Sequence, residues 1–122
     1  MYSSELLDHF EHPRNVGDLK DGSVAVQLEN PACGDILRLS MKVHDGRIVD
    51  VRFRAKGCVP AIACGSLLTE LVRGKTLTEA RAVNRQQIVD GIGGLPEAAT
   101  HASHLAIDAL VAALKQLDRP AE

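Results

Sequence analysis

Two neighbouring segments of the chain alternate strictly between apolar and polar residues, and this pattern limits the fold more than any other feature. The apolar positions are Leu37, Leu39, Met41 and Val43 in 36–44, and Val49, Val51, Phe53 and Ala55 in 47–55. Such period-two alternation indicates strands with one buried face and one solvent face. Asp45-Gly46 between them is typical of a two-residue hairpin turn, because positive φ costs these residues little. The sequence therefore predicts an antiparallel sheet, to which a weaker alternation at 24–28 adds a third strand.

Helical periodicity is found on both sides of these strands. Ser3 or Ser4 can cap a short helix that ends at Pro13. Past Gly57 one helical stripe holds Cys64, Leu67, Leu68, Leu71 and Val72. Shorter helices are expected at 77–82 and 85–91, and a last helix at about 99–117 should bury Ile107, Leu110, Val111, Leu114 and Leu117. The predicted fold is α+β, a two-layer sandwich in which helices cover one face of a three-stranded antiparallel sheet.

Length and composition limit the function. The 122 residues suit one domain over 1–122, with a flexible tail expected at 118–122. Fourteen Lys and Arg against sixteen Asp and Glu give a net charge of -2, and the chain has three aromatic residues, so no nucleic-acid partner is expected. No apolar run approaches the roughly 20 residues of a membrane span, and the N-terminus is acidic and amphipathic. Three cysteines cannot all pair internally, so a cytoplasmic, reducing location without membrane contact is predicted.

Residues able to carry chemistry occur at three breaks between the predicted elements. Cys33 and Asp35 lie in the loop 31–35, where Gly34 allows a tight turn. Cys58 directly precedes a helix, whose positive dipole end favours a thiolate. His101 opens the last helix, where the dipole favours a neutral imidazole. If the three breaks meet at one end of the sandwich, the four side chains form a ligand set for tetrahedral zinc or iron.

Plainer interpretations of these residues stay open at this point. Cys33 can be incidental to a turn, Cys58 a small space-filler and His101 a solvated residue of a first helical turn. His104 is expected to pair with Asp108, four residues on. Cys64 shares the apolar stripe of its helix and is expected in the core. The chain has no C-x-x-C pair and matches no general zinc pattern, so spacing alone does not prove that the ligands converge.

Five motifs, in order, carry a family resemblance. They are HPRNVG at 12–17, PACGD at 31–35, GC followed by AIA-x-x-SL-x-TE at 57–70, G-K-T-L-x-E-A at 74–80, and LP then H-x-S at 95–103. Together they resemble the NifU-like or IscU-type iron-sulfur cluster assembly scaffolds over almost the whole chain. The resemblance implies the same α+β sandwich. It also implies that Cys33 and Cys58 match two of the three cluster cysteines, that Asp35 matches the aspartate that tunes cluster lability, and that His101 matches the histidine beside the third cysteine.

The chain departs from the family pattern at three places. Ala102 stands where the family usually has its third cysteine, the usual acceptor of sulfane sulfur, so that role must pass to Cys33, Cys58 or Cys64, or be lost. Val59-Pro60 replaces the usual Gly-Ser. After Leu95-Pro96 the chain continues as Glu97-Ala98 and lacks Pro-Val-Lys, so an Hsp70-type chaperone is not expected to drive release.

Three functional hypotheses follow. The first is a scaffold or carrier that binds iron and sulfide, or a transient [2Fe-2S] cluster, and passes it to apo iron-sulfur acceptor proteins. A cysteine desulfurase would supply sulfur, and two cysteines per chain favour a homodimer when loaded. The second is a zinc-bound sulfur acceptor that works with a cysteine desulfurase. The third is a thiol enzyme with Cys58 as nucleophile and His101 as base. Because no oxyanion or substrate pocket is visible in the sequence, we expect a scaffold and no enzyme.

Overall fold

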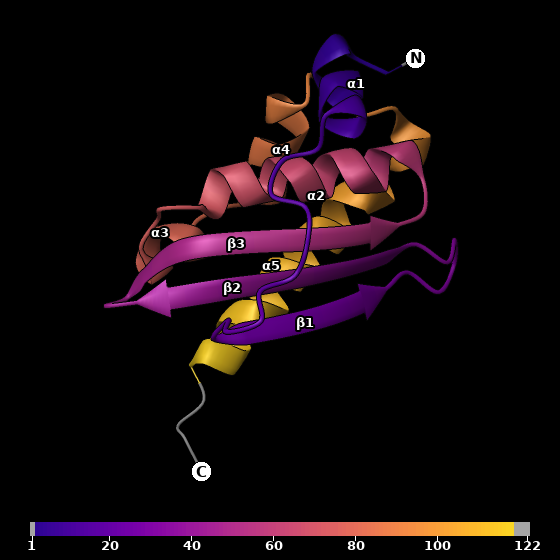
Figure 1. Ribbon diagram of the computed structural model, residues 1–122. Helices are drawn as coiled ribbons and strands as arrows, with labels where there is room; N and C mark the ends of the chain where they lie inside the picture. Colours follow the sequence, from indigo (N-terminus) through magenta and orange to yellow (C-terminus); the bar gives the residue numbers. More distant parts are fainter. Residues whose placement is uncertain (1, 119–122) are drawn as a thin grey trace.

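The computed structural model describes residues 2–118, and the predicted elements are present (Figure 1). In chain order they are α1 (Ser4–Glu11), β1 (Val24–Glu29), β2 (Ile36–His44), β3 (Arg47–Lys56), α2 (Val59–Val72), α3 (Leu77–Arg81), α4 (Arg85–Gly91), a 3₁₀ turn (Glu97–Ala99) and α5 (Thr100–Leu117). The flexible tail predicted at 118–122 lies outside the described residues except for Asp118. That residue caps the end of α5 and forms an ion pair with Arg81.

The sheet is antiparallel with the order β1-β2-β3, as the alternation predicts. The hairpin turn between β2 and β3 has φ of 53° at Asp45 and 74° at Gly46. Both residues therefore adopt the left-handed conformation that a two-residue hairpin turn requires.

The prediction that Val49 is buried is wrong. Lys42 pairs with Asp50 whereas Val43 pairs with Ile48, so β3 carries one extra residue at Val49. This bulge shifts the alternation by one position. As a result Ile48 is fully buried and Val49 is 41% exposed.

Helices α2 and α5 cover one face of the sheet, and α1 packs on the outer side of α2 (Figure 1). The predicted face of α5 is partly wrong, because Val111 is exposed. Leu110 and Leu114 are buried as predicted, and the rest of the buried side of α5 consists of Leu105, Ser103 and the small residues Ala102, Ala106, Ala109 and Ala113. Side chains this small let the helix approach its neighbours closely. Among residues 2–118, no helix combines the length and the apolar character needed to cross a bilayer.

The segment 12–23 crosses the opposite face of the sheet on its way from α1 to β1 (Figure 1). The Phe53 N–H donates to the Asn15 carbonyl and the Gly17 N–H donates to the Phe53 carbonyl, each at 2.9 Å. These bonds pair the segment with the edge strand β3. The segment does not cover the whole face. The end of the face that contains the start of β2 and the end of β3 stays uncovered.

Candidate metal centre

The loop between β1 and β2 is a tight turn built on Asn30. Its carbonyl accepts hydrogen bonds from the N–H groups of Gly34, at 2.7 Å, and Cys33, at 3.3 Å. Its side chain accepts from the Ala32 N–H at 3.0 Å. Gly34 has φ of +76°, which a glycine adopts without strain. The turn leaves Cys33 exposed and directs Asp35, which is only 2% exposed, into the protein.

Asp35 is bound to the start of α2. Cys58 is the N-cap residue of that helix, and its own side chain caps nothing. Instead the Cys58 N–H donates to Oδ1 of Asp35 at 3.1 Å, and the Cys58 Sγ donates to Oδ2 at 3.0 Å. Gly57 makes this possible, because a Cβ at that position would lie 2.1 Å from Oδ1 of Asp35.

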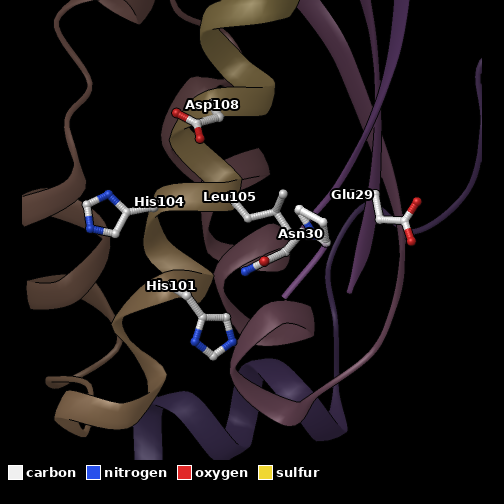
Figure 2. Close-up of a pocket in the computed structure, with 7 residues that line it drawn as sticks. Glu29, Asn30, His101, His104, Leu105 and Asp108 are labelled. Carbon is white, nitrogen blue, oxygen red and sulfur yellow. The ribbon is translucent and has the colours of Figure 1, made fainter. Parts of the chain in front are cut away.

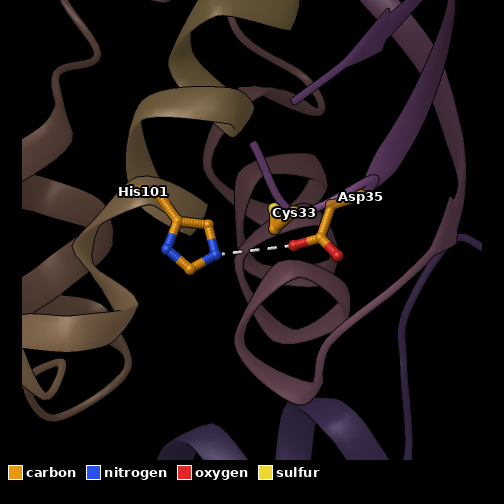
Figure 3. Close-up of side chains that lie close together, drawn as sticks. All are labelled: Cys33, Asp35 and His101. Atoms are coloured by element: carbon orange, nitrogen blue, oxygen red, sulfur yellow. Dashed lines mark ion pairs between the residues drawn. The ribbon is translucent and has the colours of Figure 1, made fainter. Parts of the chain in front are cut away.

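His101 completes the group from the first turn of α5. Its Nε2 lies 3.5 Å from Oδ2 of Asp35 and 3.8 Å from Sγ of Cys58. Single ligand atoms of Cys33, Asp35 and His101 all lie within 4.8 Å of one another (Figure 3). The four residues chosen from the sequence thus come from three separate segments and meet at one end of the sandwich.

Hydrogen bonds and burial set the protonation of the site. Burial alone would raise the pKa of Asp35, but hydrogen bonds from Cys58 and Cys33 and the nearby His101 outweigh it and lower that pKa. Burial, with a further contribution from Asp35, raises the pKa of the Cys58 thiol to about 11. The helix N-terminus favours a Cys58 thiolate as expected, through the Ala61 N–H, but burial and Asp35 outweigh that effect. The Asp35 carboxylate accepts a hydrogen bond from the protonated Cys58 thiol, and its negative charge disfavours a second negative charge on Cys58.

The neighbouring candidates fall outside the group. Cys64 is fully buried among apolar side chains, and burial raises its pKa to about 12, so its assignment to the core is confirmed. Ala102 is 1% exposed. The expected pairing of His104 with Asp108 is wrong: both side chains are exposed, and no ion pair joins them in the described part of the chain. Solvent competes with such a surface pair.

Two surface hollows flank His101. One, of about 270 Å³, lies between α5 and the end of β1 and is lined by Glu29, Asn30, Pro31, His101, His104, Leu105 and Asp108 (Figure 2). The other, of about 360 Å³, is lined by Tyr2, Cys58, Pro60, Pro96, Ala98, Ala99 and His101. His101 therefore lies between two open approaches to the site, and Cys58 lines one of them.

The sequence does not reveal how Asp35 binds Cys58 or why Gly57 is needed between them. These residues come from segments more than twenty positions apart, and no local spacing reports a contact of that kind. The one signal in the sequence is Gly57 itself, a glycine between a strand and a helix.

Fold and site together define a class, a small α+β sandwich with two thiols, a carboxylate and an imidazole grouped at one end. The model of the NifU-like N terminal domain matches residues 1–121, and the chain belongs to this family.

Named relatives agree with the family assignment. The chain is 44% identical over 110 residues to iron-sulfur cluster assembly scaffold protein IscU 1 of Archaeoglobus fulgidus, covering 90% of this chain and 72% of that protein. It is 46% identical over 117 residues to the scaffold protein IscU of Escherichia coli K12, covering 93% and 91%. The fold is similar to that of a NifU-like N-terminal protein from Brucella abortus, with a TM-score of 0.80 at 20% identity, covering 98% of this chain and 95% of that one.

Proposed function

We propose that this protein is an iron-sulfur cluster assembly scaffold or carrier. In this role Cys33, Asp35, Cys58 and His101 hold iron and sulfide, or a transient [2Fe-2S] cluster, until it passes to an apo acceptor protein. The observation that carries the proposal is the meeting of these four side chains at one exposed end of the fold. Membership of a family whose relatives are named as scaffold proteins supports it.

The donor set fits such a cargo. Two sulfur donors, one imidazole nitrogen and one carboxylate oxygen are a harder and more labile mixture than four thiolates. The thiols must lose their protons to bind. At Cys58 the proton that now points at Asp35 would be released to solvent, and the Asp35 carboxylate would lose the hydrogen bond from the thiol. Loading would therefore release a proton at Cys58, and removal of the cargo would restore the hydrogen bond to Asp35.

Partners follow from the same chemistry. A cysteine desulfurase carrying a persulfide would give its outer sulfur to a thiol of this chain, which leaves a desulfurase thiol and a new persulfide here. Cys33 is exposed whereas Cys64 is fully buried, so we propose Cys33 as the receiving thiol. Two cysteines per chain also favour a loaded homodimer. Three free thiols suit a cytoplasmic location.

A zinc-bound sulfur acceptor is the second candidate. One tetrahedral ion needs four ligands, and two thiols, an imidazole and a carboxylate supply that number. The ligand atoms of Cys33, Asp35 and His101 lie within 4.8 Å of one another. This short spacing favours a single metal ion in the site as the structure describes it.

The thiol-enzyme hypothesis has less support. Its nucleophile would be Cys58, yet burial and Asp35 raise the pKa of that thiol to about 11, opposite to what nucleophilic activation needs. The relatives are named as scaffold proteins.

One experiment separates these candidates. The protein is purified without oxygen, its visible spectrum is recorded, and iron, zinc and acid-labile sulfide are quantified. Charge-transfer bands with stoichiometric sulfide are the expected result for the scaffold. Stoichiometric zinc without sulfide would favour the sulfur acceptor, and a protein that binds neither even after reconstitution would refute both.

A further inference from the structure

A second polar feature lies on the open face of the sheet. A surface hollow of about 270 Å³ is lined by Gln27, Ile36, Arg38, Arg54, Ala55 and Lys56. We call it the basic hollow, because three of its six lining residues are cationic and none is acidic. It lies on the part of this face that the crossing segment 12–23 leaves open.

The positive charge of the basic hollow is only partly neutralised. Asp18 accepts hydrogen bonds from Nε of Arg38, at 2.9 Å, and from Nε of Arg54, at 2.7 Å. One carboxylate thus serves two guanidinium groups, and their side chains remain 41% and 62% exposed. Lys56 is exposed and has no ion pair within residues 2–118. The basic hollow therefore keeps an excess of positive charge on a protein whose net charge is -2.

Asp18 also orients the two arginines. The bond to Asp18 restrains each guanidinium through Nε and does not use its terminal Nη groups. A guanidinium held in this way has lost part of its rotamer freedom before a ligand arrives, and its open edge suits a carboxylate. Arg38 faces Arg54 directly across the β2–β3 pair.

The spacing of the cationic side chains matches that of side chains on an extended peptide. Arg54 and Lys56 are two residues apart on one strand, so their side chains leave the same face about 6.6 Å apart. An extended peptide presents the side chains of residues i and i+2 with the same period. Two acidic side chains separated by one residue would meet the two cations in register.

We propose that the basic hollow is a docking surface for an extended acidic segment of a partner protein, with carboxylates at alternate positions. A nucleic acid fits less well, because Asp18 borders the cations and no aromatic side chain lines the hollow for base stacking. Lys56 is two residues from Cys58, so the docked segment lies beside the metal centre. The proposal depends on charge and shape alone and does not depend on the cargo of that centre.

The test uses the full-length, metal-free protein labelled with ¹⁵N. A capped peptide with the sequence Gly-Glu-Thr-Glu-Gly is titrated at low salt, beside a peptide in which both Glu are Gln. The variants are Lys56→Glu, the double variant Arg54→Glu/Lys56→Glu, and a matched control, Lys75→Glu/Lys115→Glu. The control changes the net charge as much as the double variant does, at two exposed lysines outside the hollow.

The acidic peptide should shift amide signals around residues 27, 36–38 and 54–57. Lys56→Glu, which breaks no ion pair within residues 2–118, should weaken binding several-fold, and the double variant should weaken it about tenfold or more. The control should retain most of the affinity, and physiological salt should weaken binding to all proteins. Equal loss in the control, shifts elsewhere on the protein, equal binding of the Gln peptide, or tighter binding of a short oligothymidylate to the same residues would each overturn the proposal.

Discussion

The thiol of Cys58 lies 3.0 Å from Oδ2 of Asp35 and donates a hydrogen bond to that carboxylate, although the two residues are 23 positions apart. Asp35 also binds the Cys58 N–H, so one buried carboxylate holds both the reactive atom and the backbone at the start of α2. Any ligand that takes Cys58 as a thiolate has to replace this bond.

Removal of the Asp35 carboxylate should make a bound cluster longer-lived. In Asp35→Ala the pKa of Cys58 should fall, because Asp35 contributes to raising it, and a hard oxygen ligand is lost. We expect transfer to an apo acceptor to slow about tenfold, measured by the rise of the acceptor's absorbance. Asp35→Asn keeps the volume and should behave similarly if the charge is responsible. Transfer as fast as in the parent protein would limit Asp35 to a structural role.

Loss of either thiol of the site should abolish stable metal or cluster binding and leave the fold intact. Cys33 is exposed and Cys58 is half-buried at a helix start, so Cys33→Ser and Cys58→Ser remove little packing. Metal content and sulfide content give the first readout, and circular dichroism gives the second. A variant that keeps its full metal content would show that the replaced thiol is no ligand.

Cys64→Ala should give the opposite result. Cys64 is fully buried in the core, so its removal leaves a small cavity and should cost about 1 kcal/mol of unfolding free energy. Metal content should not change. Urea titration and metal analysis on the same preparation measure both effects, and an emptied site would place Cys64 among the ligands.

The elements of this fold are predictable from the sequence because their signals are local. The hairpin at Asp45-Gly46 depends on two adjacent residues, and each helix carries its own periodicity. The errors in predicted burial arise where contacts with another element determine which side chains are buried. Val49 is exposed because of a bulge defined against β2, and Val111 is exposed because the side of α5 that contacts the other elements is centred on Ala106, Ala109 and Leu110.

For the candidate site, too, the sequence predicts the local features and misses those that depend on contacts between distant segments. The sequence indicates its members because Cys33, Asp35, Cys58 and His101 stand at breaks between elements, and the family resemblance supports the same four residues. The protonation of Cys58 was not predictable, because it depends on a carboxylate from another loop and on burial. The helix dipole, which can be inferred from the sequence, lowers the pKa of Cys58, but burial and Asp35 raise it by more.

Gly57→Ala should disturb the site through contact with Asp35. The new Cβ would lie 2.1 Å from Oδ1 of Asp35, and φ at this position is +147°. We expect a loss of about 1–3 kcal/mol of stability from the backbone alone, with weaker metal binding because Asp35 must move away from Cys58.

Gly74→Ala is the matched control for this substitution. Gly74 also has positive φ, +83°, but a Cβ there meets nothing within 4 Å. It should lower the melting temperature without changing metal affinity in a titration. Equal loss of affinity in both variants would mean that strain, and not the contact with Asp35, weakens the site.

His9 should make the stability of the protein fall as the pH falls from 7.5 to 5.5. This histidine is buried between α1 and α2, with Nδ1 2.7 Å from Oγ of Ser66 and Nε2 3.2 Å from Oε1 of Glu70. Burial, assisted by Arg14, lowers its pKa against the opposing effect of Glu70 and Asp8. The folded protein therefore binds this proton less readily than the unfolded chain, whose histidine titrates near 6.5.

The sign of this effect follows from proton binding. Above about pH 6.5 both states hold a neutral His9, and the histidine adds no pH dependence. Below it the unfolded chain takes up the proton first, so the unfolding free energy decreases until the folded protein also becomes protonated. Urea denaturation at several pH values should show this slope, and His9→Asn should flatten it. The measurements stay above pH 5.5 to avoid the effect of carboxyl groups. The pKa values of Asp8, Asp18 and Asp35 are lowered in the fold, so their protonation reduces the free energy of unfolding only at more acidic pH. An unchanged slope in His9→Asn would assign the effect to another group.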